Sequence, residues 1–242
     1  SLLRPSLLPG FLQTVQYTID QKNHSFAAFE IGRIYFEQKE KKIELPMAGI
    51  FLTGKARPHH WDQKPSDFDF YDLKGILENL FESLNISDIS FHAAMHPSFH
   101  PGRQASIYLK DLPVGSFGEV HPNLLAPLDI KQRVFYAEIS LNPLILLDKS
   151  PIIMKPLPQF PSSERDWTIA LAKKMSVEQV LKTLKNFSSP LLEKIELIDR
   201  FVSETQNVTF RFTYRDPLKT ISFEEVEAEH TRLMQNVLAT LQ

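Results

Sequence analysis

Apolar residues recur at helical spacing most clearly over Asp69–Leu84, which predicts an amphipathic helix. The apolar positions on one face are Leu73, Ile76, Leu77, Leu80, Phe81 and Leu84. Asp69 or Asp72 suits the N-terminal end, where a carboxylate accepts hydrogen bonds from free backbone N–H groups. A further helix is predicted over Phe11–Asp20, directly after a Pro-Gly pair.

Segments dominated by β-branched and aromatic residues surround these helices and predict strands. They are Phe26–Phe36, Met47–Thr53, Ala105–Leu109, Leu112–Val120 and Val134–Ser140. The charged segment Lys39–Glu44 predicts a hairpin turn between the first two strands, and Lys110-Asp111 predicts one between the third and fourth. The first part of the chain is therefore predicted to be an antiparallel sheet with flanking helices.

The last part of the chain has the predicted order β-α-β-β-α, which is that of a ferredoxin-like split βαβ unit. The predicted strands are Trp167–Ala172, Leu191–Phe201 and Asn207–Tyr214. Ser176 is predicted to cap one helix, with Val177, Val180, Leu181 and Leu184 on its apolar face. Ser222 is predicted to cap the last helix in a capping box with Glu225. A final strand is either very short, at Ala239–Gln242, or missing. Together the two parts predict an α+β protein.

Five prolines between positions 141 and 163 predict an extended connection, because proline breaks helices. We place the domain boundary there, which divides the chain into domains 1–150 and 151–242. The chain does not begin with Met, and we expect it to be a piece of a longer polypeptide.

The charge and composition narrow the possible functions. The net charge is −2, and neither part of the chain carries a basic excess, so nucleic acid is not expected to be held mainly through phosphates. The chain has no cysteine, which excludes disulfides, thiolate nucleophiles and cysteine zinc sites and fits a cytoplasmic location. No apolar run approaches the ~20 residues that span a bilayer, so no membrane contact is expected.

Two segments in the last third carry a family resemblance: PQFPSSERDWTIALA at 158–172 and LIDRFVSETQNVTFRFTYRDPLKTISFEEV at 197–226. They resemble the ferredoxin-fold anticodon-binding domain that closes the β chain of bacterial phenylalanyl-tRNA synthetases. The first part resembles the catalytic-like core module of the same family. Its matching segments are SLLRPSLLPGFL, FAAFEIGRIYFE, FYDLKGILENLF, HPSFHPGRQASIYL and GSFGEVHPNLL.

The resemblance implies a C-terminal fragment of the β chain, with a class II synthetase-like sheet followed by the anticodon-binding domain. It implies that the fragment is catalytically silent and belongs to a phenylalanine–tRNA ligase with two α and two β chains. The expected partners are tRNAPhe and the catalytic α chain, which uses ATP and Mg²⁺, and no cofactor is expected in the fragment. DNA is not an expected partner.

The resemblance also implies residues that bind tRNA. Asp199 would accept from the N1–H and N2–H₂ groups of guanine, Phe201 would stack on an anticodon base, and Asn207 would contact a neighbouring base edge. Packing within the strand is the other interpretation of Phe201. Arg200 and Arg211, together with Arg215, are candidates for phosphate contacts. Arg165 either contacts RNA or forms an internal salt bridge with Asp166.

Other interpretations stay open for the first part. A class II active site needs one arginine for the ATP α-phosphate and a second to stack on adenine, yet Glu30 and Glu119-Val120-His121 stand in the matching segments. Arg33 keeps a working ATP site possible, although a surface arginine is favoured. A small-molecule sensor is a third possibility, because ferredoxin-like domains also serve as regulatory modules.

Histidines near prolines are candidates for other chemistry. The segment from His96 to His100 is predicted to be a structural loop rather than a metal site. His59-His60-Trp61 is either a surface patch of cations and an aromatic ring or a partly buried turn at the α-chain interface, and the turn is favoured.

Overall fold

The computed structural model describes residues 3–147, 154, 156–172, 175, 177–187, 189–203 and 205–241. The chain separates into two compact units, Ser1–Ile152 and Ile153–Gln242. The position near 150 where the sequence predicts the domain boundary, and Ser176, lie outside the described residues. Each unit is described by itself.

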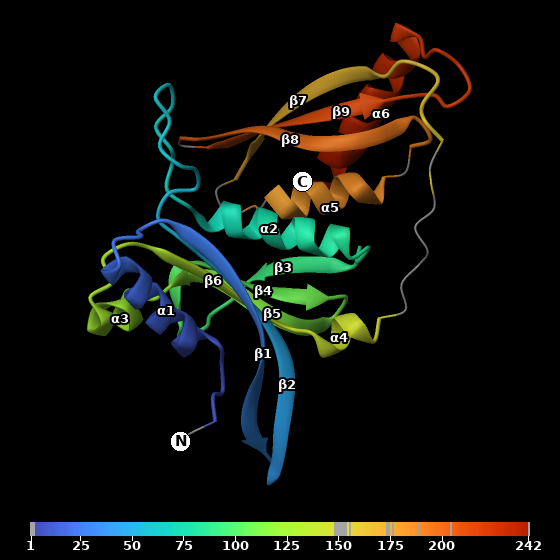
Figure 1. The fold of residues 1–242 in the computed structure, drawn as a ribbon. Helices are drawn as coiled ribbons and strands as arrows, with labels where there is room; N and C mark the ends of the chain where they lie inside the picture. The colour runs from blue at the N-terminus through green and yellow to red at the C-terminus, as the bar shows by residue number, and fades with distance from the viewer. Residues whose placement is uncertain are drawn as a thin grey trace. The chain divides into compact units, whose positions relative to one another are not determined.

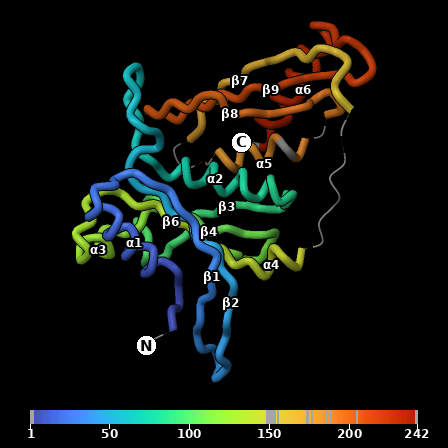
Figure 2. Tube along the Cα trace, in the orientation of Figure 1, coloured from blue at the N-terminus to red at the C-terminus, as the bar shows by residue number. Residues whose placement is uncertain are grey.

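The first unit is built on a six-stranded antiparallel sheet with the order β1-β2-β6-β5-β4-β3 (Figure 1). Its strands are β1 (Phe26–Gln38), β2 (Lys41–Thr53), β3 (Ile89–Ala93), β4 (Phe99–Leu109), β5 (Leu112–Val120) and β6 (Val134–Ser140). Only Met47–Thr53 of β2 pairs with β6. The rest of β2 therefore runs with β1 past the end of the sheet, as the tube in Figure 2 shows.

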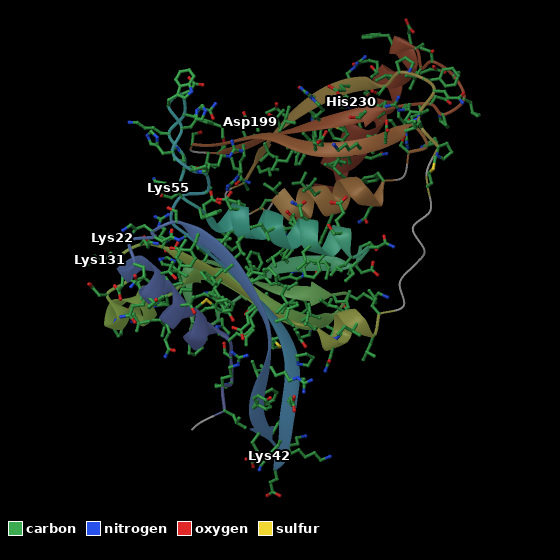
Figure 3. All side chains as sticks on the ribbon, viewed as in Figure 1. Lys22, Lys42, Lys55, Lys131, Asp199 and His230 are labelled. Carbon is green, nitrogen blue, oxygen red and sulfur yellow. The ribbon has the colours of Figure 1, made fainter. Side chains whose placement is uncertain are left out.

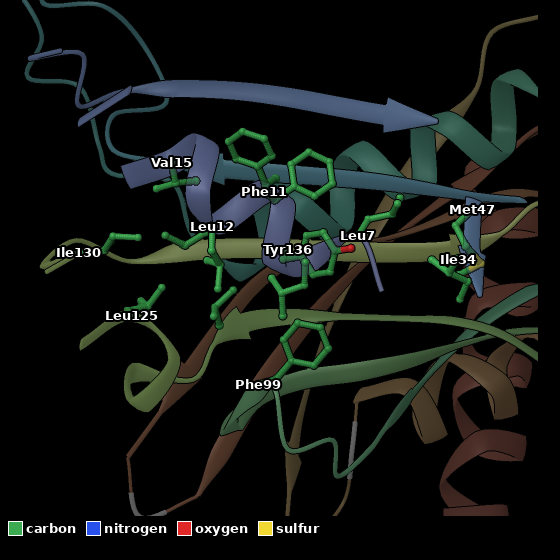
Figure 4. Packing of buried hydrophobic residues seen from close by; sticks show 14 residues of the cluster. Leu7, Phe11, Leu12, Val15, Ile34, Met47, Phe99, Leu125, Ile130 and Tyr136 are labelled. Atoms are coloured by element: carbon green, nitrogen blue, oxygen red, sulfur yellow. The ribbon is translucent and has the colours of Figure 1, made fainter. Parts of the chain in front are cut away.

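Helices cover both faces of this sheet. They are α1 (Leu8–Asp20), α2 (Phe70–Ser83), α3 (Pro122–Leu125) and α4 (Asn142–Ile145), with a short 3₁₀ turn, η1 (Ala126–Leu128). Phe11, Leu12 and Val15 of α1 pack with Tyr136 in one core, which Figure 4 shows at close range. Leu73 and the rest of the apolar stripe of α2 pack with Phe135 in the other core. Successive residues of β6 thus belong to opposite cores.

The apolar stripe of α2 shows why this segment is helical. Leu73, Leu77 and Phe81 are almost fully buried, and burying each such side chain contributes about 1.5–3 kcal/mol. Asp69 caps the helix, since its Oδ1 accepts from the N–H groups of Tyr71 and Asp72 at 2.7 and 3.0 Å. The Asp72 carboxylate accepts from the N–H of Asp69 in return, at 2.7 Å. The predicted helix and its cap are confirmed.

The structure corrects the sequence prediction in the region of β3 and β4. Ile89–Ala93 is a strand that the apolar pattern did not indicate. The segment predicted as a loop around His100 lies in β4, which begins at Phe99 rather than Ala105. A register shift against β5 between Phe99 and Gln104 accommodates Pro101 and Gly102 in the strand.

The second unit contains β7 (Ser163–Leu171), α5 (Val177–Asn186), β8 (Leu192–Val202), β9 (Gln206–Tyr214) and α6 (Phe223–Leu241). The strands form an antiparallel sheet with the order β7-β9-β8. Ser222 and Glu225 form the predicted capping box of α6, with N···O distances of 3.0 and 3.2 Å. Residues 239–241 continue α6 as helix, and the sheet has three strands within the described residues. Of the two alternatives that the sequence left open, this agrees with a missing last strand rather than a very short one.

Candidate nucleic-acid interface

The sheet of the second unit has one covered face and one open face. Along β9, side chains alternate strictly between buried and partly exposed. Val208, Phe210, Phe212 and Tyr214 pack against the apolar faces of α5 and α6. The intervening residues of β9, namely Asn207, Thr209, Arg211 and Thr213, lie on the other face. Because both helices pack on the first face, the second is left uncovered by the elements of this unit.

Three residues expected from the family resemblance meet on this open face. Strand pairing places Asp199 opposite Thr209 and Phe201 opposite Asn207. Both β8 side chains are exposed, and Phe201 retains 61% of its accessible surface. Figure 3 labels Asp199 on β8. The structure therefore places Phe201 in the open, and the alternative of half-buried packing does not apply.

A bulge in β8 creates this arrangement. The pairing register shifts between Leu197 and Asp199, so Leu197 lies opposite the inward-facing Phe210 while Asp199 lies opposite the outward-facing Thr209. A regular strand would have put both side chains on the same face, because side chains two positions apart share a face. The bulge thus places Leu197 on the covered face and the carboxylate of Asp199 on the open face.

Arg211 also lies on the open face, but a carboxylate already binds it. Its Nε and Nη2 donate to the two oxygens of Asp166 at 2.8 and 2.9 Å, and Glu164 lies 3.5 Å from Nη1. The guanidinium lowers the pKa of Asp166, mainly through these hydrogen bonds. Next to this pair, the hydroxyls of Thr168 and Thr209 form a hydrogen bond of 2.9 Å. Arg211 is therefore an internal partner of the sheet rather than a free phosphate ligand.

The open face carries more negative than positive charge. Its acidic residues are Glu164, Asp166, Glu196 and Asp199, and its basic residues are Lys194 and Arg211. Lys194 also pairs with Glu196 at 2.6 Å. Such a surface repels phosphate and leaves hydrogen bonding to base edges and stacking as the available chemistry.

Arg165 and Arg200 are not brought to the open face. Neighbouring side chains of a strand point to opposite faces, so Arg165 lies on the other face from Asp166 and points toward α6. There its Nε donates to Glu227 at 3.2 Å, and its guanidinium lies 4.8 Å from the ring centre of Phe223. The pair that the sequence suggested between Arg165 and Asp166 does not form. Arg200 lies opposite the inward-facing Val208 and donates twice to Oε1 of Gln206, at 3.0 and 2.7 Å.

Sequence reasoning missed the contribution of Thr168 and Asp166 to the open face. The alternation of polar and apolar residues in β7 was the available signal, since Glu164, Asp166 and Thr168 are exposed and Ile169 and Leu171 are buried. The partner of Asp166 could not be found in this way, because Arg211 is 45 residues away in the sequence.

In the first unit, the residues considered for an ATP site have other partners. Arg33 is exposed and pairs with Glu44 across the β1–β2 hairpin. Glu30 pairs with Arg4 at 2.7 Å. Glu119 is 5% exposed and receives hydrogen bonds from Nε and Nη2 of Arg103 at 2.5 and 3.1 Å. The buried carboxylate is thus neutralised within the sheet, as a buried charge requires.

The two histidine segments have different surroundings in the structure. The side chains of His96 and His100 accept from the backbone N–H groups of Ser98 and Gly102, at 3.2 and 3.1 Å. Over the described residues, no three His, Asp or Glu side chains converge as a metal site would require. His59, His60 and Trp61 are exposed in this chain, and their interpretation as a turn at the α-chain interface stays a prediction. No helix in the described part of the chain is long and apolar enough to span a bilayer.

The comparisons place the chain in the class of aminoacyl-tRNA synthetase chains. Residues 1–141 match the family model of the phenylalanyl tRNA synthetase β chain CLM domain, and residues 158–242 match that of the ferredoxin-fold anticodon binding domain. The chain belongs to the phenylalanyl-tRNA synthetase β chain family. The family resemblance and the α+β fold class expected from the sequence are confirmed.

Curated relatives support the same assignment. The phenylalanine–tRNA ligase β subunit of Protochlamydia amoebophila strain UWE25 is 44% identical over 238 residues, which cover 96% of this chain and 30% of that protein. The β subunit of Chlamydia caviae is 34% identical over 97% of this chain and 30% of its own length. That of Bacillus subtilis strain 168 is 30% identical over 100% of this chain and 31% of its own length. The chain thus spans about 30% of the length of these relatives.

Proposed function

We propose that this chain is the tRNA-binding and subunit-assembly part of a phenylalanine–tRNA ligase. The second unit binds the anticodon region of tRNAPhe, and the first unit packs on the catalytic α chain in a heterotetramer of two α and two β chains. The observation that carries the tRNA role is the meeting of Asp199, Phe201 and Asn207 on one open sheet face. We place this assembly in the cytoplasm, in keeping with a chain that has no cysteine.

Each of the three residues has a defined role in the proposal. The exposed ring of Phe201 stacks on an unpaired base, which is worth about 1–3 kcal/mol. The carboxylate of Asp199 accepts the N1–H and N2–H₂ of a guanine, a pattern that other bases do not offer. Asn207 lies opposite Phe201 and hydrogen-bonds the edge of the stacked base or its neighbour.

The acidic character of the face supports base reading over phosphate binding. A strand of RNA can approach four carboxylates only with its phosphates turned outward, because each phosphate carries a negative charge. Bases then face the sheet, where Phe201 and Asp199 are placed to meet them. This orientation favours contacts to bases over contacts to phosphates.

The first unit is proposed to be non-catalytic and to serve assembly. ATP and Mg²⁺ would be bound by the α chain, since Arg33 and Arg103 are engaged with Glu44 and Glu119 in the sheet. Phe29 and Ile31 leave most of their side chains exposed on the edge strand β1 and offer an apolar surface for the α chain.

The test uses the full β chain assembled with its α chain. Asp199→Ala is expected to weaken binding of tRNAPhe by about 1–3 kcal/mol, or roughly 5–150-fold in Kd. Glu196→Ala is the matched control, because Glu196 is an exposed carboxylate on the same strand and face. Filter binding should show no loss for the control.

A second tRNA separates base reading from general electrostatics. The loss caused by Asp199→Ala should disappear with a tRNA whose anticodon lacks guanine. Equal losses for both tRNAs, or equal effects of Asp199→Ala and Glu196→Ala, would contradict the proposed anticodon contact.

A further inference from the structure

Residues 54–68 form a hairpin that projects from the sheet of the first unit between β2 and α2 (Figure 1). Its stem is closed by hydrogen bonds from Ala56 N–H to the Ser66 carbonyl at 3.0 Å and from Phe68 N–H to the Gly54 carbonyl at 2.8 Å. Lys55 and Asp67 pair across it at 2.8 Å. The stem fixes the hairpin to the end of β2.

The hairpin begins at a position that requires glycine. Gly54 has a φ of +77°, and a Cβ atom there would lie 2.0 Å from the carbonyl oxygen of His24. The N–H of the next residue, Lys55, donates to the hydroxyl of Ser25 at 2.9 Å. The chain therefore leaves the sheet in a defined direction, held against the segment that precedes β1.

The tip of the hairpin presents an aromatic surface to solvent. Trp61 retains 88% of its accessible surface, the largest exposed fraction among the large apolar side chains in the described part of the chain. The imidazole of His60 lies beside it, with ring centres 5.7 Å apart and planes inclined by 32°. An indole with this exposure does not pack in the core of its own unit and adds little to its stability. Its ring face can stack on another aromatic ring.

A groove of about 760 Å³ lies between the hairpin and the start of β1. Phe26, Phe68, Pro58 and Pro65 provide its apolar lining. The charged or ionisable residues that line it are Lys55, Arg57, His59 and Lys64, and no carboxylate lines it. Figure 3 labels Lys55 at the base of the hairpin.

Two of these cations are available to a ligand. Lys55 is partly neutralised by Asp67, whereas no ion pair within the described residues involves Arg57 or Lys64. Both side chains are exposed. The groove therefore concentrates positive charge above an apolar lining, in a chain whose net charge is −2.

We propose that this groove binds the sugar–phosphate backbone of an RNA strand, with Trp61 stacking on a base or on the end of a helix. Arg57 and Lys64 neutralise the phosphates, and the apolar lining accepts a ribose or base. Basic side chains combined with exposed aromatic rings are the features of surfaces that bind single-stranded nucleic acid. The inference rests on the proposed tRNA-binding function and adds a phosphate-binding surface, which the acidic open face of the second unit does not provide.

The test measures the salt dependence of tRNA binding to the β chain assembled with its α chain. Each phosphate contact contributes about 0.7–0.9 to the slope of log Kobs against log[salt]. The double variant Arg57→Ala/Lys64→Ala is expected to reduce this slope by about 1.5 and to weaken binding about 10–30-fold at 0.1 M salt. The loss should be the same for tRNAPhe and for a tRNA with another anticodon.

The matched control is Lys39→Ala/Lys42→Ala, which removes two exposed lysines at the tip of the β1–β2 hairpin, where Figure 3 labels Lys42. This control should leave the slope unchanged. Trp61→Ala should weaken binding without changing the slope, since it removes stacking and no charge. Circular dichroism of each variant establishes that the fold is intact.

The proposal is overturned if the Arg57/Lys64 double variant binds tRNA with the slope and affinity of the control. It is also overturned if the double variant loses the α chain on gel filtration, because the groove would then be a protein interface. Asp199→Ala in the same assay separates the two ideas. If only Asp199→Ala weakens binding, the groove proposal fails, and if only the groove variant does, the anticodon proposal fails.

Discussion

Phe201 shows how much can depend on one exposed side chain. It lies on the open face opposite Asn207. The next residue, Val202, is also exposed but lies opposite the inward-facing Gln206. Phe201→Ala should weaken tRNAPhe binding by about 1–3 kcal/mol through loss of stacking, whereas Phe201→Tyr should retain it. Val202→Ala is the control, measured by the same filter assay. A loss shared by both alanine variants would indicate damage to the strand rather than loss of a stacked base.

His230 is a second residue whose surroundings determine a measurable property. It lies on α6 and shares a 2.9 Å hydrogen bond between its Nδ1 and the hydroxyl of Tyr214. Burial lowers the pKa of His230, while Glu227 raises it and Arg165 lowers it further. The neutral imidazole is therefore favoured in the folded state.

The sign of the pH dependence follows from this lowered pKa. The contribution of His230 to stability is fully present above about pH 6.5, the pKa of an unperturbed histidine, and is lost as the pH falls through the lower folded-state pKa. Thermal unfolding followed between pH 7.5 and 5 should show a smaller loss for His230→Gln than for the native chain. An unchanged pH profile would show that this histidine does not titrate with unfolding.

Among the elements, α2 depends on its cap as well as on its apolar stripe. Asp69→Ala removes the acceptor for two backbone N–H groups and should lower the free energy of unfolding by about 0.5–2 kcal/mol in urea denaturation. Glu82→Ala is the control at the other end of the helix, where a carboxylate faces the negative end of the helix dipole. It should be neutral or slightly stabilising, and equal losses for both variants would contradict a specific role of the cap.

Elements that a local pattern defines were predicted well, and those that depend on distant partners were not. The spacing of Leu73, Leu77 and Phe81 was enough to predict α2, and Ser222 with Glu225 was enough to predict the start of α6. The short strand β3 has no strong pattern of its own and is held by pairing with β4. The run of α6 to Leu241, which the sequence left open, reflects packing of Leu233 and Val237 on the sheet.

The candidate site was predictable in part for the same reason. Asp199, Phe201 and Asn207 were candidates from the family resemblance, and strand pairing puts them on one sheet face. The bulge between Leu197 and Asp199 arises from the pairing of β8 with β9. The residue types in β8 do not reveal this pairing. The partners of Arg165 and Arg211 depend on tertiary contacts and were not found from the sequence.

At the scale of the whole molecule, the two units carry surfaces of opposite charge. The open sheet face of the second unit holds four carboxylates. The groove beside the 54–68 hairpin of the first unit is lined by basic side chains and by no carboxylate. A net charge of −2 therefore conceals two surfaces of opposite character. Average composition predicted the absence of a general basic excess but could not show this separation.

The position of β6 between two cores limits how the first unit can change over evolutionary time. Phe135 and Tyr136 point to opposite sides, so losing or gaining one residue in this strand would exchange the two sets of side chains and spoil both packings at once. Lineages of such chains should therefore accumulate insertions and deletions at the β1–β2 tip, while the length of β6 stays constant.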